Sequence, residues 1–255
     1  MNSADKDALR PGLMTNPGDG ICRAADALRQ RYLSVRDRLD EAVRRSGREP
    51  RDVTLVAVSK FHPAEAIRVV AEAGHAAFGE SYAQEALPKQ DALRDLPLEW
   101  HYIGRLQTNK AKDVTGRFAL IHTVDSLKLA ETLSRRLADG TRQGVLLQIN
   151  VGQEAQKAGV EATDAEQLAE SILALPNLRL HGLMCLPPFF DDGEAARPYF
   201  AALREQRDRL AARLGVALPC LSMGMSGDFV QAVEEGATLV RIGTDIFGER
   251  TTLYV

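Results

Sequence analysis

Eight short apolar segments recur along this chain of 255 residues, and nearly all are followed by a segment of helical character. The apolar segments are rich in aliphatic and β-branched residues, which is typical of parallel strands that helices cover on both faces. Eight such strands in alternation with helices close into a (β/α)8 barrel, so we predict a single TIM-type α/β barrel. An open, doubly wound sheet is the alternative, but no glycine-rich dinucleotide fingerprint follows the first strand. The predicted strands span residues 53–59, 76–79, 99–103, 118–124, 145–151, 178–184, 218–221 and 238–242.

Apolar residues at spacings of three and four from Leu28 to Val43 predict an extra helix before the first strand. No change of composition and no long linker divides the chain, so we expect residues 21–255 to form one barrel domain. Residues 1–20 contain Pro, Gly, Asn and Asp without an apolar core, and we expect them to form a disordered tail. The last strand has no clear helix after it. Further helices are predicted at 63–73, from 82 onward, and at 107–114, 126–137, 162–175, 194–214 and 227–235.

The composition argues against several classes of function. A formal net charge of −3 gives no electrostatic reason to expect binding to nucleic acid or to an acidic membrane surface. Cys22, Cys185 and Cys220 are far apart and lack metal-ligand spacing, which favours reduced thiols over a disulfide framework or a zinc site. The first residues resemble neither a secretion signal nor a membrane anchor, and no apolar run is long enough to span a bilayer. We expect a cytoplasmic protein without a metal ion, and a monomer.

Lys60 stands directly after the first predicted strand. An amine at the rim of a low-dielectric sheet loses its proton more easily than one in water, and the neutral amine can attack an aldehyde to form a Schiff base. On this segment alone, a solvated lysine that ends a strand is more common than a lysine that forms a Schiff base. The other strand ends decide between the two, because chemistry in these barrels collects at the C-terminal ends of the strands.

The last two strand ends carry hydroxyls and flexible glycines. Residues 222–227 (SMGMSG) precede a predicted helix, and residues 241–244 (RIGT) leave the adjacent strand. Backbone N–H groups at such positions bind anions, and a phosphate pocket after strands seven and eight recurs in these barrels. An amine and a phosphate pocket on one face indicate either pyridoxal 5′-phosphate (PLP) or a sugar phosphate. Arg241 favours PLP if its guanidinium points inward, because PLP proteins place an Asp or an Arg opposite the pyridine nitrogen.

A family resemblance rests on seven segments in order: LVAVSK, FGESYAQE, WHYIGRLQTNK, HTVD, GLMCLPP, LSMGMSGD and VRIGTDIFGER. Together they resemble the pyridoxal phosphate homeostasis protein family (YggS-type). The fold of that family resembles the N-terminal barrel of alanine racemase, a fold-type III PLP-binding barrel. The resemblance covers nearly the whole chain beyond the first twenty residues.

The resemblance implies a set of PLP-binding residues. Lys60 would carry PLP as a Schiff base, and Arg241 would face the pyridine nitrogen. At one position the chain departs from the family pattern: Ser81 stands where the motif has Asn, and a shorter hydroxyl reaches less far. The phosphate would be bound by Ser226, Gly243 and Thr244 with help from Ser222 and Gly224, and the ring would be walled by Met184, Ile103 and Gly104.

The resemblance also implies a function, namely intracellular PLP homeostasis by buffering the cofactor and delivering it to PLP-dependent apo-enzymes, without robust catalysis. A weak PLP-dependent amino-acid racemase is the first alternative. It needs a second base besides Lys60, which relatives that racemise alanine take from a further β domain, and the chain has no length for one after its eighth strand. A lysine-dependent sugar-phosphate aldolase is the second alternative. Candidate bases within the chain are Tyr82, Tyr102, Tyr199, Tyr254, His62 and His122, although each is more commonly a core or surface residue.

Overall fold

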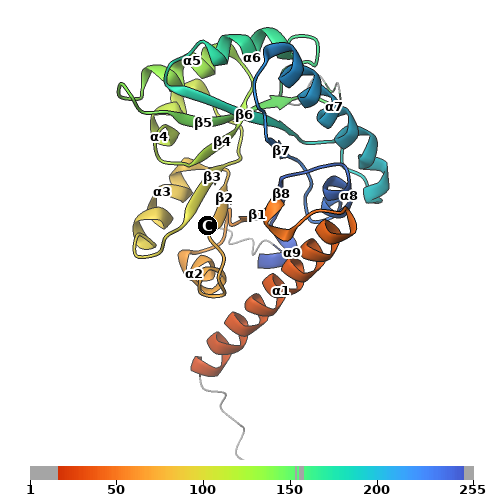
Figure 1. Cartoon of the computed structure of the whole chain (residues 1–255). Coiled ribbons are helices and arrows are strands. Elements are labelled where there is room, and N and C mark those ends of the chain that lie inside the picture. The colour runs from red at the N-terminus through yellow and green to blue at the C-terminus, as the bar shows by residue number, and fades with distance from the viewer. Residues whose placement is uncertain (1–16, 153, 155–157, 250–255) are drawn as a thin grey trace, which may run out of the picture.

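The structure is a computed structural model that describes residues 17–152, 154 and 158–249. Eight parallel strands form a closed barrel in the order β1 to β8, with helices around the outside (Figure 1). This confirms the predicted (β/α)8 barrel. The strands are β1 Thr54–Val58, β2 Ala77–Glu80, β3 Glu99–Tyr102, β4 Leu120–Val124, β5 Gln143–Ile149, β6 Leu178–Cys185, β7 Cys220–Ser222 and β8 Leu239–Ile242.

The helices follow the strands in alternation, and a short helix also follows β8, where the sequence showed no clear one. Two predicted helices, 107–114 and 194–214, each begin with a 3-10 turn, at Thr108–Lys110 and Gly193–Ala196. A further 3-10 turn, Pro50–Asp52, precedes β1. The α-helices are α1 Pro17–Arg45, α2 Ala64–Glu72, α3 Ala83–Ala92, α4 Ala111–Val114, α5 Leu127–Arg135, α6 Ala165–Leu173, α7 Arg197–Leu214, α8 Phe229–Glu234 and α9 Thr244–Phe247.

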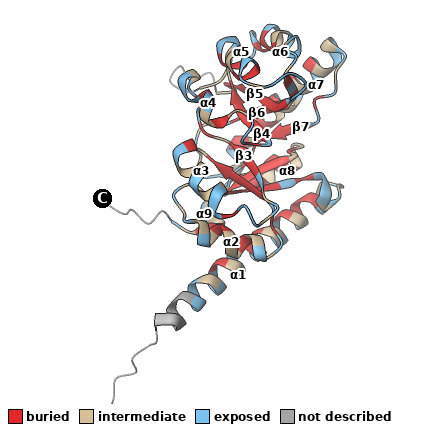
Figure 2. Ribbon diagram, turned by 90° about the vertical axis from the view of Figure 1, so that its left-hand side faces the viewer, coloured by how far each residue is buried: buried red, intermediate tan, exposed pale blue. Residues whose placement is uncertain are grey.

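Helix α1 covers the side of the barrel where β8 meets β1. Its apolar stripe, including Tyr32 and Leu39, is buried, and it packs against α2, α8 and α9. The Arg31 side chain donates to the Ile246 carbonyl of α9 at 2.8 Å. The helix begins at Pro17, inside the segment 1–20 expected to be a tail; residues 1–16 of that segment lie outside the described residues. Its N-terminal end extends away from the barrel (Figures 1 and 2).

The apolar core has two parts. The larger part lies between the sheet and the surrounding helices, and Figure 2 shows the strands as almost entirely buried. A small cluster of Val56, Leu120, Leu146, Met184 and Leu239 fills part of the barrel interior. The remaining interior contains polar side chains, which matter for the site.

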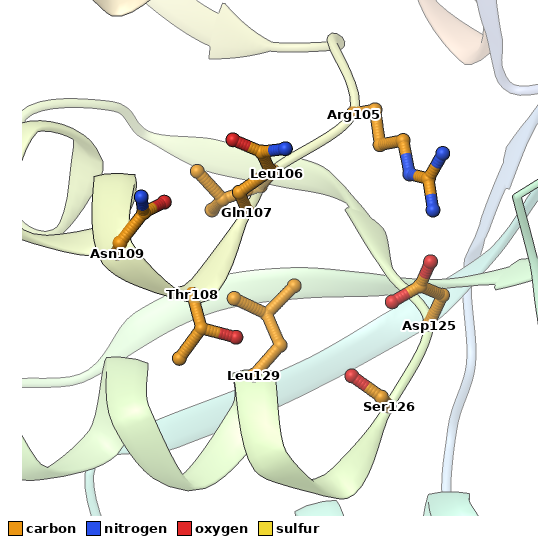
Figure 3. Close-up of a pocket in the computed structure, with 8 residues that line it drawn as sticks. All are labelled: Arg105, Leu106, Gln107, Thr108, Asn109, Asp125, Ser126 and Leu129. Carbon is orange, nitrogen blue, oxygen red and sulfur yellow. The ribbon is translucent and has the colours of Figure 1, made fainter.

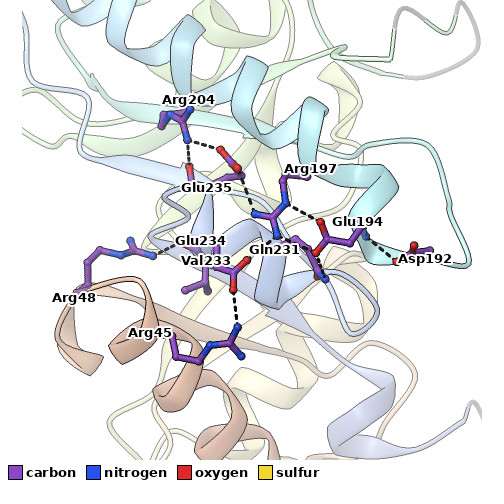
Figure 4. Close-up of polar contacts among 10 residues, drawn as sticks. All are labelled: Arg45, Arg48, Asp192, Glu194, Arg197, Arg204, Gln231, Val233, Glu234 and Glu235. Atoms are coloured by element: carbon purple, nitrogen blue, oxygen red, sulfur yellow. Dashed lines mark hydrogen bonds and ion pairs between the residues drawn. The ribbon is translucent and has the colours of Figure 1, made fainter.

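A network of ion pairs fixes α7 and α8 relative to α1 (Figure 4). Arg197 on α7 pairs with Glu234 of α8 at 2.7 Å, and Arg45 at the end of α1 reaches the same carboxylate at 3.4 Å. Arg48 donates to the Val233 carbonyl at 2.5 Å. These contacts hold α8 in place, and α8 follows the loop after β7.

Among the described residues, no helix has the length and apolar character to cross a membrane. Likewise, in the part of the chain that the structure describes, no group of three or more potential metal ligands comes together.

Candidate functional site

Lys60 lies at the C-terminal end of the barrel, directly after β1, and lines a cavity of about 530 Å³. The cavity is open to solvent between the ends of β1, β2 and β3. Three other predicted site residues, Ser81, Ile103 and Gly104, line the same cavity. Its full lining is Lys60, Ser81, Tyr82, Ala83, Gln84, Tyr102, Ile103, Gly104, Arg105, Gln107 and Lys110.

The residues on both sides of Lys60 are held by hydrogen bonds, and on the Ser59 side these come from a buried ion pair between Glu80 and Lys89. The Ser59 hydroxyl donates to Glu80 Oε1 at 2.7 Å, and Lys89 Nζ donates to the same oxygen at 2.8 Å and to the Ser59 carbonyl at 3.0 Å. On the other side, the Phe61 N–H donates to Glu85 Oε2 at 3.0 Å. Phe61 has φ of +66°, a left-handed conformation that is strained for a bulky residue. Strand β2 and helix α3 thus hold the Lys60 backbone in place.

Glu80 is fully buried, and its second carboxylate oxygen, Oε2, has no hydrogen-bond partner among the described residues. Burial raises the pKa of Glu80 above its ordinary value, and the nearby Lys89 opposes that rise. Lys89 therefore offsets part of the cost of a buried carboxylate next to the Lys60 loop.

Close backbone packing forms the wall on the β2–β3 side of the cavity. A Cβ added at Gly104 would lie 2.1 Å from the Ser81 carbonyl oxygen, so only glycine fits there. The Thr123 hydroxyl donates to the Gly104 carbonyl at 2.6 Å, and the Ile103 N–H donates to the Glu80 carbonyl at 2.9 Å. These contacts fix the position of Ile103 and Gly104, which were expected to lie against the ring of a bound cofactor.

The two predicted anion loops lie next to each other and beside the end of β1. Gly243 follows Ile242, which pairs with Ala57 of β1, and a Cβ on Gly243 would lie 3.3 Å from Val58 Cβ. The Gly224 carbonyl accepts from the Arg241 N–H at 3.0 Å, which joins the loop after β7 to β8.

The loop after β7 depends on glycine. Gly224 has φ of +90°, and a Cβ there would lie 2.6 Å from Ala232 Cβ of α8. Ser226 is half-buried and Thr244 is exposed, so their hydroxyls lie at the rim. These rim residues do not line the Lys60 cavity itself.

Arg241 points into the barrel interior, as PLP binding would require. Its Nη1 donates to Ser222 Oγ at 2.5 Å and its Nη2 to the Cys185 carbonyl at 3.0 Å. Burial lowers the pKa of Arg241 below its ordinary value. Met184 is also fully buried in the interior. Ser222 differs from the expectation of phosphate binding, because its hydroxyl lies in the interior between Arg241 and His122.

Several residues that contact the site or its interior neighbours were given no role from the sequence: Glu80 and Lys89 hold the Lys60 loop, and His101 contacts His122 in the barrel interior. His122 was considered only as a base, but it is fully buried and hydrogen-bonded to Ser222 and to His101. The sequence did contain a signal for the buried pair: a histidine lies inside each of two apolar strand segments, His101 in WHYI and His122 in LIHTV. A buried polar residue in a strand requires a partner.

Of the candidate second bases in the part of the chain that the structure describes, only Tyr82 and Tyr102 line the Lys60 cavity. Burial raises the pKa of Tyr102 to about 12, so its hydroxyl keeps its proton at neutral pH. Tyr199 packs on Phe190 instead. Tyr254 lies outside the described residues.

His62, another candidate base, stacks on Phe247 with ring centroids 4.9 Å apart. It is not among the residues that line the Lys60 cavity.

A second hollow, of about 420 Å³, lies between the loops after β3 and β4 (Figure 3). Arg105 and Asp125 point toward each other across it. None of the predicted site residues lines this hollow. The Lys60 cavity is therefore the candidate site.

Comparison with known proteins shows which family this chain belongs to. The family model for the N-terminal domain of alanine racemase matches residues 31–251, which include every predicted site residue. The pyridoxal phosphate homeostasis protein of Aquifex aeolicus is 48% identical over 222 residues, covering 87% of this chain and 97% of that protein. The chain belongs to the pyridoxal phosphate homeostasis protein family.

Two further comparisons agree with this assignment. The pyridoxal phosphate homeostasis protein of Pseudomonas aeruginosa is 46% identical, with 87% of this chain and 95% of that protein covered. Among solved structures, PipY of Synechococcus elongatus with PLP bound is 38% identical. It covers 87% of this chain and all of its own, with a TM-score of 0.76.

Proposed function

We propose that this member of the pyridoxal phosphate homeostasis family binds PLP at the barrel mouth and serves to buffer and deliver the cofactor. The observation that carries the proposal is that Lys60 lines an open cavity at the same barrel end as the interior Arg241. The solved structure of PipY, 38% identical, contains PLP, and the curated relatives are named for PLP homeostasis.

The residues present fit each functional group of PLP. Lys60 offers a primary amine for the aldehyde, and Arg241 offers a guanidinium for the pyridine nitrogen. The Gly243–Thr244 peptide and the Ser226 hydroxyl offer donors for the phosphate, beside the end of β1. Gly104 brings the backbone after β3 close to Ser81, so no side chain at that position intrudes on a ring in the cavity. This match of an amine, a cation and an anion loop supports PLP over an unphosphorylated aldehyde.

PLP supplies an aldehyde whose carbon bonds reversibly to a primary amine with loss of water. The chain's residues position this chemistry. The contacts of Ser59 and Phe61 hold the Lys60 backbone, and Arg241 donates a hydrogen bond while it keeps its own proton. A ring nitrogen that faces a guanidinium stays largely unprotonated and is a weak electron sink. This favours binding and release over carbanion chemistry.

The openness of the site also favours a carrier. Tyr82 and Phe61, the aromatic residues beside Lys60, are 47% and 46% exposed, with their rings 5.4 Å apart. A cofactor held at such a rim is accessible to an acceptor protein. We therefore assign delivery to PLP-dependent apo-enzymes as the role of the open face.

The test is to add PLP to the purified protein, reduce with borohydride and locate the adduct by mass spectrometry. We expect a visible band and a pyridoxyl group on Lys60, both lost in Lys60→Ala. Lys110→Ala removes the other lysine of the cavity and should leave both unchanged. A wild-type protein that stays colourless and unlabelled with PLP would end the proposal.

The two alternatives give different results. A racemase exchanges the α-proton of alanine or serine in deuterated water, and this exchange is lost in Lys60→Ala. An aldolase is trapped by borohydride with a sugar phosphate on Lys60 instead of PLP. Borohydride labelling by PLP without proton exchange across a panel of amino acids would support the carrier.

A further inference from the structure

A continuous chain of hydrogen bonds crosses the barrel interior from Arg241 to the opposite face. Five side chains from four strands form it, and the donor–acceptor distances lie between 2.5 and 2.9 Å. The contacts are Arg241 Nη1 to Ser222 Oγ (2.5 Å), Ser222 Oγ to His122 Nδ1 (2.8 Å), His122 Nε2 to His101 Nδ1 (2.9 Å) and His101 Nε2 to Glu99 Oε1 (2.9 Å).

A hydrogen-bond chain of polar side chains is unusual in the interior of a barrel. Branched apolar side chains normally fill such an interior, and burying polar groups is unfavourable unless they are paired. Ser222, His122, His101 and Arg241 are all buried, whereas the Glu99 side chain is 58% exposed. Glu99 is the first residue of β3, at the barrel end opposite Lys60. The chain therefore links a buried cation near the site to a carboxylate in solvent on the far face.

The direction of the hydrogen bonds follows from the two ends. The hydrogen bond from His101 lowers the pKa of Glu99, so Glu99 is a carboxylate and accepts from His101 Nε2. A neutral His101 then accepts at Nδ1 from His122 Nε2, and His122 accepts at Nδ1 from the Ser222 hydroxyl. Ser222 in turn accepts from Arg241. Every neutral member donates once and accepts once.

The state of His122 agrees with this direction. Burial is the largest cause that lowers the pKa of His122 well below its ordinary value, and the buried Arg241 cation acts in the same direction, so His122 stays neutral. Hydrogen bonds that run in one direction from a cation to an anion polarise one another and strengthen the chain.

We propose that Glu99, His101, His122 and Ser222 act as positioning residues that fix the Arg241 guanidinium, so that a carboxylate on the far barrel face controls the arginine of the cofactor site. The part of this inference that concerns PLP rests on the proposed function. The hydrogen-bond chain is present in the protein without PLP, so its existence can be tested on the cofactor-free protein.

The first test uses the protein without PLP. In protein with ¹⁵N-labelled histidine, NMR at pH 7.5 should show His122 and His101 neutral and protonated at Nε2. In Glu99→Gln the amide either accepts from or donates to His101, so the two nitrogen signals of His122 should move toward each other. Glu170→Gln makes the same change on exposed α6 and should leave both signals unchanged. A charged or Nδ1-protonated His122 in the wild type, or unchanged signals in Glu99→Gln, would overturn the inference.

The second test uses PLP binding. Glu99→Gln should raise the Kd for PLP on the order of threefold and shift the pH midpoint of the visible band. Ser222→Ala, which removes the link to Arg241, should raise the Kd about tenfold, or 1.4 kcal/mol. Unchanged Kd and spectrum in both variants would refute the positioning role. A wild type that binds no PLP would instead refute the proposed function, and the NMR result on the cofactor-free protein would still decide whether the chain exists.

Discussion

Lys89→Met tests whether a buried ion pair holds the Lys60 loop. Methionine keeps most of the length of the side chain and removes its charge and donors. The Lys89 side chain is 11% exposed, and its Nζ contacts Glu80 Oε1 at 2.8 Å and the Ser59 carbonyl at 3.0 Å. The substitution leaves Glu80 as a buried carboxylate with one donor, the Ser59 hydroxyl.

The expected loss of stability is large. Removing one partner of a buried ion pair costs about 3–5 kcal/mol, because the other charge stays buried without compensation. For a domain of this size each kcal/mol corresponds to about 2–4 °C in Tm, so the Tm should fall by roughly 6–20 °C. The Lys60 loop should loosen as well, and PLP binding should weaken.

The loss should depend on pH in a defined direction. The folded-state pKa of Glu80 is already raised, and removing Lys89 raises it further. A carboxyl with a raised pKa favours folding while it is protonated, and that contribution is lost as the pH rises through the folded pKa. The difference between Lys89→Met and wild type should therefore be largest at pH 8 and shrink toward pH 5.

The assay is thermal and urea unfolding, followed by circular dichroism, of wild type and variant at both pH values. Lys128→Met, on the exposed surface of α5, is the matched control and should lose less than about 0.5 kcal/mol. The reasoning would be refuted if Lys89→Met lost as little as the control. An equal deficit at both pH values would show that Glu80 is not the group left unpaired.

Two further predictions concern the wall of the cavity and the thiols. Gly104→Ala should destabilise the protein by about 1–3 kcal/mol and narrow the PLP site, because its Cβ would lie 2.1 Å from the Ser81 carbonyl oxygen. Gly227→Ala meets nothing within 4 Å and is the control in the same unfolding assay; equal losses would contradict the argument. Cys22 is exposed, whereas burial raises the pKa of Cys185 to about 12. A thiol reagent at pH 8 should therefore modify Cys22 in the folded protein and Cys185 only after unfolding, and rapid labelling of Cys185 would disprove its burial.

The number of strands and the side of the barrel that carries the site were predictable from the sequence. Strand and helix periodicities are local properties, and eight parallel strands leave few arrangements other than a closed barrel. Because chemistry collects at the C-terminal strand ends, Lys60 and Arg241 could be placed at the same barrel end. The seven family motifs predicted which cofactor the site binds, namely PLP.

The partners of those residues were decided by the tertiary structure alone. Ser222 contacts His122 a hundred residues away, and His122 contacts His101 across adjacent strands. Such contacts depend on strand register and on which side chains face the interior once the barrel closes, and no periodicity in the sequence encodes them. The same holds for Lys89, whose charge meets Glu80 only when α3 folds back against β2. The sequence thus determined the barrel and the identity of the reactive groups, whereas closure of the barrel determined what holds them.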